Sequence, residues 1–146
     1  IQKTVFRSQM QIAMDIKKPI IFHNRNADKD MISVLNEFPE VNGIAHCFSS
    51  TLETAQSFLE QGYYISFSGN LTFKNSHLPD VAKDIPLNRI LVETDCPYLS
   101  PDPYRGKTNE PGRVRLVAEK LAKIHSLPLE KIVDITSNNA TDIFQL

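Results

Sequence analysis

Short apolar runs alternate along the chain with longer segments of helical periodicity. Four of these runs, at residues 19–23, 43–47, 63–67 and 90–95, predict β-strands. The first run has no polar alternation, which is typical of a strand that is covered on both faces. The pattern therefore predicts four strands, each separated from the next by a longer segment.

The segments around the strands predict helices. Apolar stripes at helical spacing indicate helices over residues 2–17, 27–38, 114–124 and 129–144, and another between Ser50 and Gly62. Ser50 and Glu53 form a capping box at the start of that helix, and Gly62 predicts its end. Asn109 and Pro111 mark the start of the helix over 114–124. In the poorly patterned stretch that follows residue 69, a short helix is expected around residues 78–84.

Strands that alternate with helices at this spacing predict a parallel sheet of βα units. Four units make half of a (β/α)8 barrel, which normally takes about 250 residues. We therefore expect a single domain over residues 1–146, either an open four-stranded α/β domain or a piece of a larger barrel. The chain enters helical periodicity at Ile1 without a start signal, so we expect that further sequence preceded it.

Composition places the chain among ordinary globular proteins. Hydrophobic residues make up 41% and charged residues 23% of the chain, and its formal net charge is -1. This charge excludes the strongly basic field of proteins that coat nucleic acid, so any such role must be local. The two cysteines have no CxxC spacing, and no apolar run approaches the length that crosses a membrane. We expect a cytoplasmic protein with no membrane contact.

Three ligand-type residues stand at the ends of predicted strands, namely His23, His46 and Asp95. Parallel strands end at one rim, so we expect these side chains to converge. Imidazoles and a carboxylate are preferred by zinc and tolerated by manganese or magnesium. Either histidine alone is more typical of a hydrogen-bonded rim residue than of a ligand, but three ligand types at equivalent positions raise the case for a metal site.

Four motifs in order carry a family resemblance. They are H-x-R at 23–25, H-C-F-S at 46–49, E-T-D-x-P-Y-L at 93–99 and R-G-x-x-N-E-P at 105–111. Together they resemble the signatures of the TatD nuclease family over the whole chain. The resemblance implies a (β/α)8 TIM-type barrel of which this chain is the C-terminal half.

The resemblance also implies a metal-dependent deoxyribonuclease that cleaves phosphodiester bonds of DNA. Residues matching His23 and His46 bind one divalent ion, and the residue matching Asp95 serves a second ion and the attacking water. Magnesium, manganese or zinc are the expected ions. The family's amino-terminal H-x-H pair and bridging glutamate have no counterpart in these residues. We therefore expect this chain alone to hold only part of the two-metal site and to lack activity by itself.

Two arginines are candidates for substrate binding. Arg25 is expected either to clamp a phosphate oxygen or to form a surface salt bridge. Arg105 and Lys107 are expected to line a nucleotide channel in which Tyr98 and Tyr104 offer stacking faces. The alternative is that these residues belong to a purely structural loop.

Two further functions stay open at this point. The metal site could serve another ester or amide, because barrel folds support many reactions. Alternatively, the chain could be a non-catalytic half-barrel that acts as an interaction module. A half-barrel exposes two unpaired sheet edges, so we also expect self-association through those edges.

Overall fold

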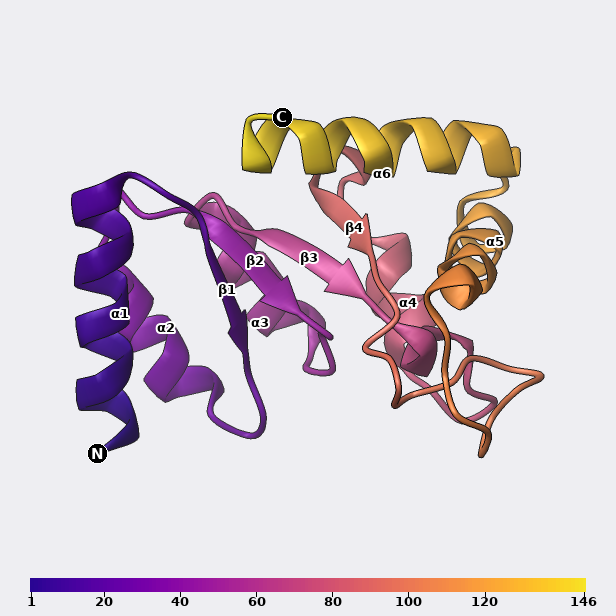
Figure 1. Cartoon of the computed structure of the whole chain (residues 1–146), viewed down its shortest axis with the longest axis horizontal. Helices are drawn as coiled ribbons and strands as arrows, with labels where there is room; N and C mark the ends of the chain where they lie inside the picture. Colours follow the sequence, from indigo (N-terminus) through magenta and orange to yellow (C-terminus); the bar gives the residue numbers. More distant parts are fainter.

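The predicted strands form one parallel sheet in the order β1-β2-β3-β4, and the computed structural model describes all residues from 1 to 146 (Figure 1). The strands are β1 (Ile20–His23), β2 (Gly43–His46), β3 (Tyr64–Phe67) and β4 (Ile90–Val92). Every neighbouring pair is parallel, so all four carboxyl ends lie at one rim. This arrangement confirms the predicted α/β class.

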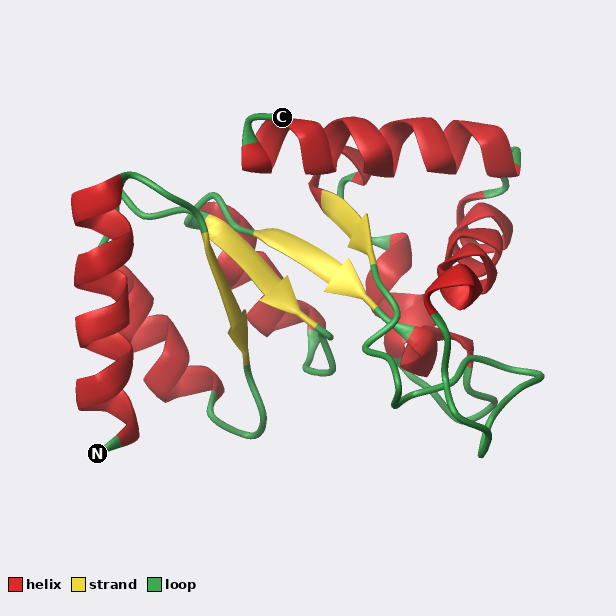
Figure 2. Ribbon diagram, viewed as in Figure 1, coloured by secondary structure: helices red, strands yellow, loops and turns green.

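Helices connect the strands, and α1 to α4 lie along one side of the sheet (Figure 2). The α-helices are α1 (Gln2–Ile16), α2 (Asp28–Asn36), α3 (Leu52–Glu60), α4 (Leu78–Lys83), α5 (Val114–His125) and α6 (Leu129–Phe144). Three short 3-10 helices are η1 (Gly69–Thr72), η2 (Leu87–Arg89) and η3 (Pro111–Arg113). None of the helices has the length and apolar character that crossing a lipid bilayer requires.

Alternate strand residues face opposite sides of the sheet, and the main core lies on the helix side. Every strand contributes to this cluster of 24 buried side chains, through Phe22, Ala45, Ile65, Phe67 and Ile90. On the other side, a small cluster joins three strands to α6 through Ile44, Tyr64, Leu91 and Ile143. Ile21 of β1 also faces this second side and is 56% exposed. The second side is therefore only partly covered.

Helix α6 lies across the amino-terminal ends of the strands, opposite the rim (Figure 1). Asn139 is buried, and its amide donates to the carbonyl oxygens of Leu87 and Ile90, each at 2.8 Å. These bonds tie α6 to η2 and to the start of β4. The carboxyl rim stays free of this helix.

The predicted capping box of α3 is wrong. The N-cap of α3 is Thr51, whose hydroxyl accepts a hydrogen bond from the Thr54 amide at 3.3 Å. The Ser50 hydroxyl instead donates to the Asp28 carboxylate at 2.7 Å. Ser50 therefore ties the loop after β2 to α2 through a charge-assisted hydrogen bond, and its neighbour Thr51 caps α3.

Both edges of the sheet are unpaired within this chain, because β1 and β4 each have a single neighbour. Helix α1 also exposes a stripe of apolar side chains on its outer face, formed by Ile1, Val5, Ile12 and Ile16. Unpaired edges and apolar stripes favour association with another chain. The expected self-association agrees with these features and stays a prediction.

Candidate metal centre

His23 and His46 lie side by side at the carboxyl rim. They are register partners at the ends of β1 and β2, and their ring centroids are 6.1 Å apart. Because Phe22 and Ala45 face the helices, the histidines face the partly covered side of the sheet. The strands thus bring two imidazoles together, as their positions in the sequence predict.

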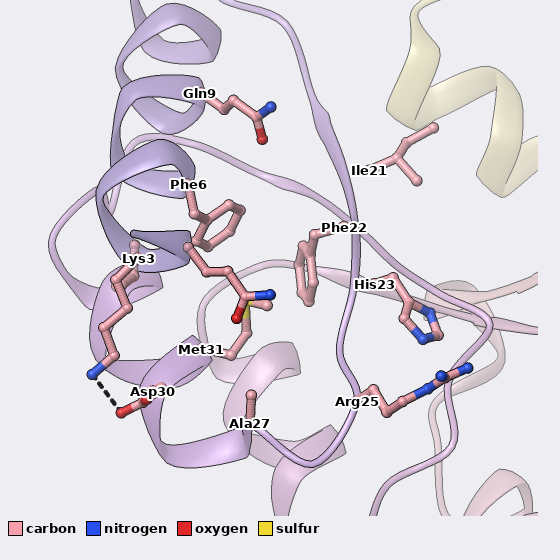
Figure 3. A pocket seen from close by; sticks show the side chains of 12 residues that line it. Lys3, Phe6, Gln9, Ile21, Phe22, His23, Arg25, Ala27, Asp30 and Met31 are labelled. Carbon is pink, nitrogen blue, oxygen red and sulfur yellow. Dashed lines mark ion pairs between the residues drawn. The ribbon is translucent and has the colours of Figure 1, made fainter.

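His23 opens into a hollow of about 460 Å³ along the outer edge of β1, between α1 and α2. Figure 3 shows His23 and Arg25 on one side of β1, while Phe6 and Phe22 lie on the other. Arg25 takes part in none of the ion pairs of the chain, so the surface salt bridge expected as one alternative is not formed. The phosphate contact stays a prediction.

Glu93 holds His46 in one orientation. The Nδ1 atom of His46 lies 2.5 Å from Oε2 of Glu93, and Oε1 accepts from the Cys47 amide at 2.7 Å. An ionised carboxylate only accepts, so in the neutral imidazole the hydrogen sits on Nδ1 and the lone pair on Nε2. A carboxylate behind an imidazole is typical of metal-binding histidines.

Asp95 faces the other nitrogen of the same imidazole. Its Oδ1 lies 3.3 Å from Nε2 of His46. Two lone pairs this close repel each other unless a cation or a proton lies between them. The row formed by Glu93, His46 and Asp95, called the Glu93–His46–Asp95 row below, is therefore chemically suited to a divalent ion.

Two small buried serines lie on the strand between the ligand-bearing strands. Glu93 and Asp95 follow β4, while His46 ends β2, and β3 lies between these strands. Ser66 is in β3, Ser68 directly follows it, and both are buried. Because side chains alternate along a strand, both serines lie on the side opposite Ile65 and Phe67, which face the helices.

Asp95 does not end a strand as expected, because β4 stops at Val92. The Glu93 amide still donates to the Phe67 carbonyl at 3.0 Å, but the backbone at Asp95 turns left-handed with φ of 52°. A left-handed residue cannot continue a parallel ladder. The Tyr98 amide then donates to the Asp95 carbonyl at 3.0 Å and closes a turn.

Asn109 clamps this turn and does not start a helix, which corrects its predicted role. Its side-chain amide donates to the carbonyl oxygens of Thr94 at 2.6 Å and Tyr98 at 2.8 Å, and its backbone amide donates to the Pro97 carbonyl at 2.9 Å. The side chain is buried. Asn109 therefore fixes the backbone on both sides of Asp95, and α5 begins later, at Val114.

The predicted ligands meet in pairs. His46 is the common neighbour, with His23 on one side and Asp95 on the other. No three His, Cys, Asp or Glu side chains of the chain are placed to hold one ion by themselves. The assignment of His23, His46 and Asp95 as metal ligands, and of Asp95 as the catalytic residue, stays a prediction.

Cys47 lies beside the row but does not offer a thiolate. Burial raises the pKa of its thiol to about 11, and the negative charges of Asp95 and Glu93 add to this rise. The thiol is therefore protonated at neutral pH, as is typical of buried structural cysteines. Cys96 is exposed, in contrast, and has no disulfide partner.

Arg105 lies in the loop after Asp95, and its guanidinium stacks over the Phe73 ring at 4.3 Å. It lines a second hollow, of about 680 Å³, together with Tyr98 and Lys107. Arg105 makes no hydrogen bond or ion pair with the Glu93–His46–Asp95 row. Arg105 thus makes no direct polar contact with the candidate ligands, whereas Arg25 lines the same hollow as His23.

The contact between Glu93 and the His46 imidazole was not expected from the sequence, and its effect on metal binding can be measured. Glu93→Gln should lower the affinity of the protein for Mn²⁺ by about 10- to 100-fold, as loss of a carboxylate behind a metal-binding histidine does. The amide offers only one accepting oxygen for the two N–H groups that Glu93 binds. Calorimetric titration with Mn²⁺ measures the change. Glu60→Gln, at an exposed position in α3, is the control, and equal affinities of the two variants would contradict the prediction.

Known proteins resemble this chain over its whole length. Residues 1–145 match the family described as TatD related DNase. YabD of Bacillus subtilis (strain 168), an uncharacterized metal-dependent hydrolase, is 45% identical over 149 residues, which cover 100% of this chain and 58% of YabD. YcfH of Escherichia coli (strain K12), also named a metal-dependent hydrolase, is 42% identical and aligns with 99% of this chain and 56% of its own length.

Solved structures agree with the fold. The crystal structure of YjjV, a TatD homologue from Escherichia coli K12, matches with a TM-score of 0.88 at 28% identity, over 94% of this chain and 54% of that protein. A TatD family hydrolase from Entamoeba histolytica has the same fold, with a TM-score of 0.84 at 23% identity over 95% of this chain and 55% of its own. These matches confirm the βα units of a TIM-type barrel, and the chain spans just over half the length of these relatives. The chain belongs to the TatD related DNase family.

Proposed function

We propose that this protein is a divalent-metal-dependent hydrolase that cleaves phosphodiester bonds of DNA. The observation that carries the proposal is the Glu93–His46–Asp95 row, in which a carboxylate orients an imidazole toward a second carboxylate. The family is described as a DNase family, and its relatives YabD and YcfH are named metal-dependent hydrolases. Both points support the proposal.

The donor set suits a divalent ion. His23 and His46 would supply neutral nitrogen ligands and Asp95 a charged oxygen, a combination accepted by zinc, manganese and magnesium. When bound, the ion would polarise the phosphate and lower the pKa of a coordinated water. One carboxylate and two imidazoles are few ligands for a two-metal centre, so a complete centre would take further donors from outside these residues.

The residues of the chain would divide the remaining work. Glu93 keeps the hydrogen of the His46 imidazole on Nδ1 and so keeps Nε2 free to bind. Asp95 would accept the proton of the attacking water, since its carboxylate lies next to His46 and is only partly exposed. Arg25, beside His23 and without a carboxylate partner, would hold a phosphate oxygen of the substrate.

Hydrolysis of a labelled single-stranded oligonucleotide tests the proposal. With added Mg²⁺ or Mn²⁺ we expect cleavage by the chain extended at its amino terminus and none by this chain alone, and EDTA should abolish the cleavage. His46→Ala should abolish cleavage. His77→Ala should not, because His77 is exposed and lies outside the Glu93–His46–Asp95 row.

Two outcomes count against the proposal. If neither form of the protein cleaves DNA with any of these ions, or if His46→Ala cleaves as fast as the unmodified protein, the assignment fails. Metal-dependent hydrolysis of a nitrophenyl ester or amide without cleavage of DNA would point to a different substrate for the same metal site.

A further inference from the structure

We propose that the hollow beside the loop of residues 96–109, called the Tyr98 pocket below, binds one unpaired nucleotide of a DNA strand next to the metal centre. The base would stack on the Tyr98 ring, and its phosphate would lie against Arg105 and Lys107. This inference rests on the proposed function, because it assumes that the substrate is a nucleic acid. The Tyr98 pocket has a volume of about 680 Å³, which falls in the range of ligand-binding sites.

The Tyr98 pocket adjoins the metal centre. Tyr98 lies three residues after Asp95, and its backbone amide donates to the Asp95 carbonyl at 3.0 Å. Asn109 binds the carbonyl oxygens of both Thr94 and Tyr98. The Tyr98 backbone is therefore held in a fixed position relative to Asp95, which follows β4 at the carboxyl rim.

The walls of the pocket are packed and hydrogen-bonded. The Asp102 amide donates to the Thr72 hydroxyl at 2.9 Å, which joins the loop to η1. Gly69 allows the two segments to touch, because a Cβ atom there would lie 1.8 Å from the Leu99 carbonyl oxygen. The loop of residues 96–109 therefore has a defined shape, although it contains no regular secondary structure.

Only one of the two tyrosines in this loop is available for stacking. The guanidinium of Arg113 lies over the Tyr104 ring at 4.3 Å, and the Lys107 ammonium lies 5.9 Å from the centroid of that ring. No cation lies over the Tyr98 ring, and the residue is 72% exposed. An exposed aromatic ring in a fixed loop is the platform on which single-stranded nucleic acids stack, because every base has a π-face.

The charge of the pocket is positive. Arg105 and Lys107 line it, neither takes part in an ion pair, and no carboxylate is among the lining residues. Arg105 rests on Phe73 with its donors free. The net charge of the whole chain is -1, so these two cations provide a local attraction for phosphate. A paired base could not reach the Tyr98 ring, so the pocket should favour single strands and frayed ends.

Fluorescence anisotropy with a labelled oligothymidylate tests the inference. The measurement is made in EDTA, so that the strand stays intact, and no residue proposed for the pocket is a metal ligand. Tyr98→Ala should weaken binding by about 5- to 150-fold, the usual loss for one stacked base. Tyr98→Phe should retain the affinity. Arg105→Ala should weaken binding and reduce the salt dependence by about one phosphate contact.

Matched controls separate stacking from general effects. Phe144→Ala and Lys131→Ala remove an exposed ring and an exposed cation from α6, at the opposite end of the strands, and should bind normally. An oligonucleotide with abasic sites should bind the unmodified protein and Tyr98→Ala equally well. The inference is overturned if the unmodified protein does not bind the oligonucleotide, or if Tyr98→Ala binds it as tightly as the unmodified protein.

Failure of the inference and failure of the proposed function give different results. Tyr98-dependent binding without any metal-dependent cleavage would contradict the proposed function and leave the pocket as a nucleotide site. Metal-dependent cleavage with binding that is insensitive to Tyr98→Ala would contradict the pocket and leave the hydrolase. The two measurements are independent, because Tyr98 is largely exposed and its removal does not disturb the buried core.

Discussion

Asp95→Asn should lower kcat for metal-dependent cleavage of single-stranded DNA by about 10²- to 10⁴-fold, the range lost when a general base is removed. Asparagine is the suitable replacement, because residue 95 has a left-handed backbone with φ of 52°, which asparagine tolerates well. It also keeps the size of the side chain next to His46. Initial rates at a series of substrate concentrations, with Mn²⁺ present, separate kcat from KM.

The control for this variant is Asp142→Asn. Asp142 is exposed on α6, at the opposite end of the strands, and should be replaceable without loss of activity. If Asp95→Asn keeps more than a tenth of the activity, Asp95 does not handle the proton of the attacking water. An equal loss in both variants would indicate a general effect on folding rather than a role for Asp95.

Phe58→Ala should lower the free energy of unfolding by about 3–5 kcal/mol, a large share of the 5–15 kcal/mol typical of a domain. Phe58 is fully buried in α3. Its ring meets the Phe22 ring edge-on at 5.3 Å and the Phe48 ring at 6.3 Å. Phe22 precedes His23 and Phe48 follows His46 by two residues, so the cavity would open among direct neighbours of the candidate ligands.

Urea unfolding followed by circular dichroism measures this loss of stability. Phe144→Ala is the matched control, because the Phe144 ring is 39% exposed and its removal should change the free energy of unfolding by less than about 1 kcal/mol. A loss below 1 kcal/mol for Phe58→Ala would show that the aromatic contacts under the rim contribute little to stability.

Local sequence patterns predict most of the elements correctly. The helix expected at 129–144 has those bounds, the helices expected at 2–17 and 78–84 end one residue earlier, and the strand expected at 19–23 begins one residue later. Gly62 ends the turn after α3 with φ of 84°, as its place in the pattern predicts. These features depend on periodicity, glycine and proline, which act over a few residues.

Errors arise where a distant group competes for a local signal. Ser50 has the right spacing to Glu53 for a capping box, yet its hydroxyl binds Asp28 on a different helix. Asn109 has the right position for a helix start, yet its amide is used by the turn that carries Asp95. In both cases a partner far along the chain offers a better hydrogen bond than the local one.

The amino-acid sequence alone was enough to predict the four βα units and the position of His23 and His46 at the rim, and it contains the TatD motifs. Each of these features depends on a few consecutive residues. The tertiary structure alone decided that Glu93, 47 positions after His46, orients that imidazole. That contact depends on the register of strands that are far apart in the sequence, and no local pattern encodes it. The structure likewise decided that Tyr98 is free while Tyr104 is covered, because Arg113 reaches Tyr104 from a different turn of the chain.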